Sequence, residues 1–232
     1  KQLELAIDMY KRLGTLDFFS LDGRNQWDLS YATLFNATNA SGLFLRREDL
    51  EPEGWVVGDD MVFRRDSERA LPLLEGQLVT RYDHRARTYA GFPVSRKYGR
   101  KPGIPYTTDE QKADPKFEIE PRYWMLAATA ESRIKEKMGD RALIAFRDVG
   151  ATWTNQRSAK AALIPRWPAT HTVPILGVPV GLVMEFLGLF NSTIFDFLVR
   201  GHMPSGHVAL TWMLSQIAAP EPGLDARIAE NA

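Results

Sequence analysis

The segment 173–199 constrains the fold most, because it is the most apolar part of the chain. Pro174 and Pro179 interrupt it near its start, and Glu185, Asn191 and Asp196 lie within it. A membrane-spanning helix needs about 20 predominantly apolar residues, and it tolerates such prolines and carboxylates poorly. The segment therefore predicts a buried core element of a globular domain rather than a membrane span.

The composition agrees with a folded domain in a reducing compartment. A chain of 232 residues can bury one large core or two small ones, and its 44% apolar and 25% charged residues are typical of globular proteins. Cysteine is absent, which excludes disulfides and thiolate metal sites. The chain starts at Lys1 and no basic-then-apolar leader opens it, so we expect a fragment of a longer cytoplasmic protein.

The spacing of apolar residues changes along the chain. Apolar residues recur at helical spacing in 3–13, whereas 27–35 alternates with period two and predicts a half-buried strand. We expect further strands in 55–57, 61–64, 77–82 and 142–149, a strand that becomes a helix at Ala127 in 123–138, and helices in 181–200 and 207–217. These elements predict the α+β class, with a mixed sheet and flanking helices.

A polar segment, 94–121, contains several prolines and glycines and predicts a long exposed loop. We expect a single domain over 1–220, and this loop is where it would divide into two lobes. The tail 221–232 is expected to fray.

Charge is balanced overall, with 29 basic and 29 acidic residues, but it is uneven locally. The segment 81–101 has seven basic residues against Asp83, a net charge of +6, and 133–166 has eight against three acids, a net charge of +5. Aromatic residues such as Tyr82 and Tyr89 lie among the basic ones. This pattern is found in nucleic-acid-binding surfaces, although a basic run can also be a merely solvated face.

The sequence lacks the motifs of most catalytic sites. There is no Gly-x-Gly loop for a nucleotide cofactor, and the nearest approach to an amino-methylase motif, Asp114-Pro115-Lys116-Phe117, lacks the second proline. The spacing of the four histidines predicts no zinc site. Asp83 and His84 could form an acid–base pair, or His84 could be a structural histidine. We therefore predict no catalytic residue, metal or cofactor in this chain.

Several short phrases occur in an order that resembles one protein family. They are NASGLF (39–44), LPLLEG (71–76), YDHR (82–85) with Tyr89, RYW (122–124), FRD (146–148), TNQR (154–157), Ile164-Pro165, Asn191-Ser192, Phe195-Asp196, Arg200 and a closing segment 214–220. Together they cover about 27–220 and resemble the target-recognition region of bacterial adenine-specific (N6) DNA methyltransferases. That family includes Eco57I-like type II restriction–modification enzymes and the methylases of the DISARM and BREX phage-defence systems.

The resemblance implies sequence-specific binding of double-stranded DNA. Methyl transfer would belong to an upstream methyltransferase domain of the same polypeptide, which binds S-adenosylmethionine, so this fragment alone would not be an enzyme. Other restriction or defence subunits are further expected partners. Two alternatives stay open: a protein–protein interaction module, which predicts an exposed apolar patch, and a hydrolase that uses Asp83 and His84.

The predicted contacts follow the chemistry of DNA recognition. Arginine reads guanine and asparagine or glutamine reads adenine, whereas other basic groups hold phosphates. The predicted base-reading residues are Arg147, Thr154, Asn155, Gln156 and Arg157. The predicted phosphate contacts are Arg81, Arg85, Arg96, Lys97, Arg100 and Lys101, together with Ser205 and His207 at an expected helix start.

Simpler roles remain open for four of these positions. The stretch 147–157 could be a surface turn with capping side chains, and Arg147 could pair with Asp148. His84 and Arg85 could be internal to the fold. Asn191 is expected to bond the backbone rather than DNA.

Overall fold

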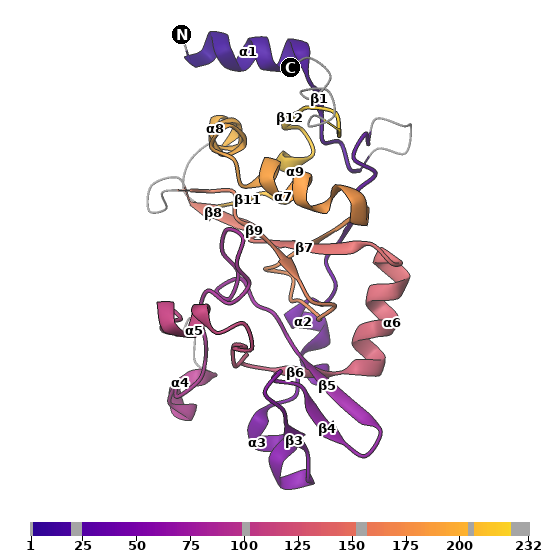
Figure 1. Cartoon of the computed structure of the whole chain (residues 1–232), viewed down its shortest axis with the longest axis vertical. Coiled ribbons are helices and arrows are strands. Elements are labelled where there is room, and N and C mark those ends of the chain that lie inside the picture. Colours follow the sequence, from indigo (N-terminus) through magenta and orange to yellow (C-terminus); the bar gives the residue numbers. More distant parts are fainter. Residues whose placement is uncertain (1, 20–24, 99–102, 152–156, 204–206, 224–232) are drawn as a thin grey trace.

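The computed structural model describes residues 2–19, 25–98, 103–151, 157–203 and 207–223. It has the expected α+β class and is built around a four-stranded antiparallel sheet (Figure 1). The strand order is β2 (Ser30–Ala32), β10 (Ile175–Val178), β7 (Ala142–Phe146) and β9 (Ala161–Ile164). β2 and β9 are its edge strands.

This central sheet separates two hydrophobic cores. In β7, Leu143 and Ala145 face the lower core of Figure 1, and Ile144 and Phe146 face the upper one. Successive side chains of a strand point to opposite faces, so a strand covered on both sides is apolar throughout. This is why 142–146 has a continuous apolar sequence rather than an alternating one.

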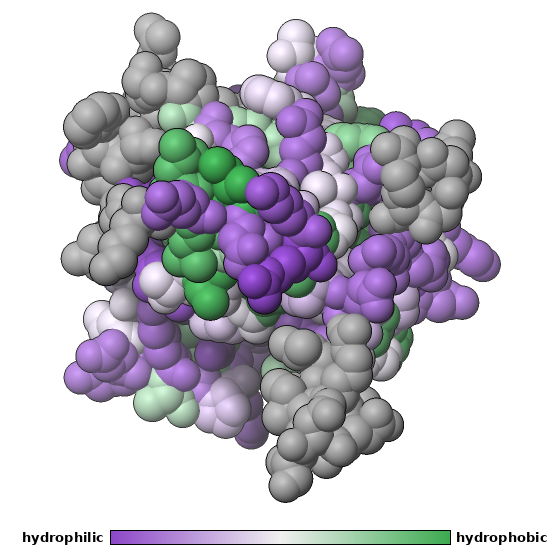
Figure 2. Space-filling view, turned by 90° about the horizontal axis from the view of Figure 1, so that it is seen from above, coloured by the Kyte–Doolittle hydropathy of each residue, from purple (hydrophilic) through white to green (hydrophobic). Residues whose placement is uncertain are grey.

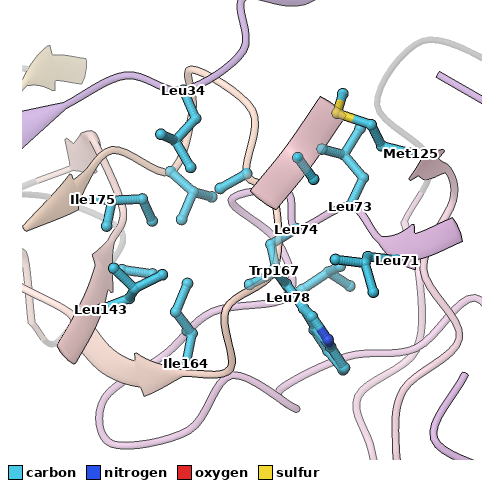
Figure 3. Packing of buried hydrophobic residues seen from close by; sticks show 14 of the residues in the cluster. Leu34, Leu71, Leu73, Leu74, Leu78, Met125, Leu143, Ile164, Trp167 and Ile175 are labelled. Atoms are coloured by element: carbon cyan, nitrogen blue, oxygen red, sulfur yellow. The ribbon is translucent and has the colours of Figure 1, made fainter. Parts of the chain in front are cut away.

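The lower core joins the central sheet to a second antiparallel sheet, and Figure 3 shows Leu143, Ile164 and Ile175 opposite Leu71, Leu73 and Met125. The second sheet has the order β3 (Val56–Val57), β4 (Phe63–Arg65), β5 (Glu68–Pro72) and β6 (Trp124–Leu126). The helix α6 (Ala127–Met138) starts where β6 ends and leads into β7. The expected change from strand to helix at Ala127 is confirmed.

The upper core is covered by helices. They are α7 (Val183–Phe190), α8 (Thr193–His202) and α9 (Thr211–Leu214), with α1 (Gln2–Arg12) at the top of Figure 1. β1 (Gly14–Thr15) pairs with β12 (Ala218–Ala219), which brings the two ends of the described chain together.

The single helix expected over 181–200 is wrong, because it is two helices. Ser192 accepts a hydrogen bond from the Phe195 N–H and caps α8, and Asn191 bonds the backbone of Ala161, as expected for this residue. Within the described residues, no single helix meets the length and apolarity needed to cross a bilayer. By length and composition alone one pair meets them together, Val180–Phe190 and Thr193–His202, and it is bent by 65°.

The remaining elements are short. They are α2 (Ala37–Ala40), α3 (Arg47–Leu50), α4 (Val94–Lys97), α5 (Asp109–Ala113), the 3-10 turns η1 (Ser41–Leu43), η2 (Glu51–Glu53) and η3 (Val180–Leu182), and the strand pair β8 (Val149–Ala151) and β11 (His207–Ala209). The expected strand over 77–82 is a turn, and the helix expected from His207 starts as β11. In the polar segment 94–121, Ile104 and Ile119 are buried in the lower core, which anchors that segment.

Candidate nucleic-acid interface

Two distant basic segments meet at one end of the central sheet. The Arg147 N–H donates a hydrogen bond of 3.1 Å to the Lys160 carbonyl, which extends the β7–β9 pairing by one step. The Tyr82 N–H donates a bond of 2.8 Å to the Ala161 carbonyl at the start of β9. Because β9 is an edge strand, the turn that carries Arg81 and Tyr82 can dock there, beside Lys160.

The charges at this edge act on one another. Burial lowers the pKa of Lys160, and the positive charges of Arg147, Arg200 and Arg81 lower it further, whereas the charge of Asp196 raises it. The charged form of a lysine becomes less stable relative to its neutral form when the side chain is desolvated and surrounded by like charges.

Arg147, which directly follows the neighbouring strand β7, is in a similar environment. Burial is the main cause that lowers its pKa, and the charge of Arg87 adds to it, whereas Tyr106 acts in the opposite direction. We call Arg81, Arg87, Arg147, Arg157, Lys160 and Arg200 the basic cluster.

Asp196, on α8, anchors one side of the basic cluster. Its side chain is buried, and Oδ1 accepts hydrogen bonds from the N–H groups of Ser158 (2.6 Å) and Ala159 (2.9 Å). Oδ2 lies 3.0 Å from Arg200 Nε and 3.7 Å from Arg157 Nη1. The carboxylate therefore fixes the backbone just after Arg157 and partly balances two of the arginines.

Exposed aromatic rings line the basic cluster. The Arg87 guanidinium donates a 2.6 Å hydrogen bond to the Ile104 carbonyl and lies 3.8 Å from the centre of the ring of Tyr106, a residue that is 69% exposed. The Arg81 guanidinium lies 5.7 Å from the ring of Tyr82, a residue that is 54% exposed. Arg81 Nε is buried and has no hydrogen-bond partner among the described residues. Guanidinium groups held against aromatic faces beside unsatisfied donors are suited to phosphates and bases.

The structure corrects two of the predicted phosphate contacts. Lys97 is 2% exposed and its ammonium forms a 3.0 Å ion pair with Glu120, so it is not available to DNA. Arg85 donates hydrogen bonds to the carbonyls of Phe117 and Asp114, which agrees with the alternative that it is internal to the fold. Lys97 thus joins two parts of the polar segment, and Arg85 attaches that segment to the turn region before it. A basic run in the sequence cannot distinguish such bonds from free charges.

The other predicted contacts have different positions. Arg96 is exposed on α4, and His207 lies on β11 instead of at a helix start. Arg157 is 27% exposed and donates a 2.8 Å hydrogen bond to Thr193 Oγ1. Thr154, Asn155, Gln156, Arg100, Lys101 and Ser205 lie outside the described residues.

Asp148 and Asp83 do not bond the residues beside them in the sequence, Arg147 and His84. Asp148 Oδ1 accepts hydrogen bonds from the N–H and Oγ1 of Thr211, so Asp148 serves α9 rather than Arg147. Asp83 accepts the Arg85 N–H and pairs with Lys112 at 3.0 Å.

His84 has other neighbours than Asp83. Its Nε2 lies 3.7 Å from Glu118 Oε2, and its ring packs against the edge of Trp167. The geometry therefore gives no support to an Asp83–His84 dyad, and His84 has the surroundings of a structural histidine.

A second surface feature lies between α1 and α8. This groove is lined mainly by apolar side chains, among them Leu3, Ala6, Ile7 and Phe197, with Tyr10 and His202 at its polar side. Leu3 is 72% exposed and Ile7 is 45% exposed. Figure 2, which views the α1 end of the molecule, shows apolar side chains gathered beside hydrophilic ones on this face.

Sequence reasoning missed part of the basic cluster. Arg87 and Lys160 contribute to the local charge but belong to no motif that distinguishes them. Tyr106, Asp196 and Arg200 give no sequence signal of a charge-binding site.

No protein-family model matches the chain, and no curated protein or solved structure is detectably similar to it.

Proposed function

We propose that this chain binds double-stranded DNA through the basic cluster and serves as the target-recognition part of a cytoplasmic adenine-N6 DNA methyltransferase. The observation that carries DNA binding is the convergence of Arg81 and Arg87 with Arg147 and Lys160 at one sheet edge. The methyltransferase context depends on the ordered phrases in the sequence. S-adenosylmethionine and the catalytic residues would belong to the upstream domain of the parent polypeptide.

Physical chemistry favours a polyanionic ligand here. The fold keeps Arg147 and Lys160 partly desolvated among like charges. This environment disfavours their charged forms and lowers their pKa values. A row of phosphates reverses this cost, because each phosphate supplies the opposite charge that the cluster lacks. Perturbed cations gathered on one surface are accordingly typical of binding sites.

Base reading is assigned to the segment that ends at Arg157. Its partly exposed guanidinium is oriented by Thr193 and Asp196, and an arginine fixed in this way can bond a guanine edge with little loss of entropy. Thr154, Asn155 and Gln156 are proposed as further base contacts, and Arg147 as a contact to either a base or a phosphate.

The test measures DNA affinity by fluorescence anisotropy across a series of salt concentrations. The triple variant Arg81→Ala, Arg87→Ala, Lys160→Ala should lower the slope of log affinity against log salt by about 0.9 for each phosphate that it no longer neutralises, or by about 2.7 in all. The matched control Arg64→Ala, Arg69→Ala, Arg133→Ala removes the same charge from side chains that are 48%, 48% and 41% exposed on β4, β5 and α6. Equal slopes for both variants would contradict the proposal.

A protein–protein interaction module is the second candidate, and the α1–α8 groove favours it. In that case the basic triple variant would bind its partners normally, and Leu3→Ser with Ile7→Ser would abolish association with the other subunits of the parent system. Measuring the binding of both variants to DNA and to the partner subunits separates the candidates, because each variant removes one surface and leaves the other intact.

A further inference from the structure

The turn beside the basic cluster presents two residues at its tip. Thr80 and Asp83 bond each other through their backbones, with N–H to carbonyl distances of 2.8 Å and 3.4 Å, so Arg81 and Tyr82 form a two-residue tip. The sequence predicts a strand ending at Tyr82, and the structure has a tight turn instead.

Tyr82 has an unfavourable backbone conformation for its residue type. Its φ is +60°, whereas Arg81 is not among the described residues with positive φ. Positive φ at the third residue alone is the pattern of a type II turn, where glycine or asparagine is usual. A bulky residue with positive φ is uncommon, and such strain concentrates at functional sites.

Surrounding bonds hold this strained backbone in place. The Tyr82 N–H donates to the Ala161 carbonyl, and Asp83 accepts the Arg85 N–H at 2.7 Å and pairs with Lys112 at 3.0 Å. The turn is thus pinned on both sides. The residue is 54% exposed, so core packing does not explain why a tyrosine occupies this position.

The position of the ring indicates what it could contact. Tyr82 bonds the residue that follows Lys160, and Arg81 lies over its ring at 5.7 Å. A ligand whose phosphates contact Arg81 and Lys160 would therefore place its bases within reach of the Tyr82 face. Aromatic faces bind bases of any sequence by stacking.

We propose that Tyr82 is a stacking wedge, which inserts against a base of the DNA held on the basic cluster. This inference rests on the proposed DNA binding and adds a positioning role that phosphate contacts do not provide. A wedge works best where the base stack is already open, because less unstacking energy is then needed. The chain should accordingly prefer a duplex that carries a single bulged thymine over the same intact duplex.

The experiment compares the affinity of the 232-residue chain for these two duplexes. The wild-type chain should bind the bulged duplex about fivefold or more tightly, which is the lower end expected for stacking on one base. Tyr82→Gly should bind both duplexes equally, and Tyr82→Trp should keep the preference. Phe19→Ala is the control, because that ring is 50% exposed and packs on Tyr31 of β2, the opposite edge strand.

Two further readouts exclude a folding defect and locate the contact. Glycine suits the positive φ, so Tyr82→Gly should melt at the same or a higher temperature than the wild type. The bulged thymine should be protected from permanganate by the wild-type chain but not by Tyr82→Gly. If Tyr82→Gly keeps the preference, or if the wild type shows none while it still binds intact DNA, the wedge is refuted and DNA binding stands. Salt-insensitive or absent binding to both duplexes would instead refute the proposed function itself.

Discussion

Lys160→Met should stabilise the fold and weaken DNA binding. Methionine keeps most of the side-chain length and removes a charge that burial and three arginines disfavour in the folded state. Stabilising substitutions contribute about 0.5–2 kcal/mol, and the partial exposure of Lys160 places this one at the lower end, about 0.5–1 kcal/mol. For a chain of this size that raises Tm by about 1–4 °C.

The effect on DNA follows from the removal of one phosphate contact. The slope of log affinity against log salt should fall by about 0.9, which between about 1 M and about 0.15 M salt corresponds to roughly a fivefold loss of affinity. Thermal melting and anisotropy on the same sample measure the two effects. Lys135→Met is the control: it removes the same charge from an exposed position on α6 and should leave the slope unchanged.

The pH dependence of stability provides an independent check. The folded-state pKa of Lys160 lies below its ordinary value of 10.5, so the unfolded chain keeps the proton at pH values where the folded chain has released it. The cost of the charge is therefore fully present below the folded pKa and is relieved as pH rises towards 10.5. The stability difference between Lys160→Met and the wild type should shrink over that window. A lower Tm for Lys160→Met at neutral pH would refute this reasoning, and a higher Tm with an unchanged salt slope would remove Lys160 from the DNA contacts.

Two other predictions concern buried polar groups. Asp196→Asn should lower the free energy of unfolding, measured in urea, by about 3–5 kcal/mol. The amide oxygen can still accept the backbone hydrogen bonds, but the amide nitrogen would place a donor next to the Arg200 guanidinium. Asp60→Asn is the control: this carboxylate is exposed, and its loss should cost less than about 1 kcal/mol. Burial raises the pKa of Tyr98, and the hydrogen bond that its hydroxyl donates to Glu48 raises it further, so the stability that depends on the neutral phenol is present below about pH 10 and is lost as pH rises beyond it. The pKa values of Tyr89 and Tyr10 are also raised by burial, so Tyr98→Phe should reduce the amplitude of the late phase of the phenolate absorbance titration by one tyrosine, and an unchanged amplitude would contradict this assignment.

Local patterns in the sequence predict the elements whose apolar residues recur at the period of that element. The helix near the start of the chain and the strand that becomes a helix at Ala127 both follow the spacing of their own apolar residues. The α+β class and the core position of β10 and α7 are likewise accessible. Turns and short strands are not: β11 exists because it pairs with β8, which is more than fifty residues away in the sequence.

The sequence by itself also determined that positive charge is concentrated in two segments, but not which of those charges are free. Lys97 and Arg85 belong to the same basic run, yet the tertiary structure engages both in bonds within the fold. Nothing in its own segment distinguishes Lys160, yet it lies among three arginines from three separate segments. Local composition reports how many charges a segment carries, whereas their pairing and desolvation depend on contacts between residues far apart in the chain, so only the folded structure decides which of them can meet a ligand.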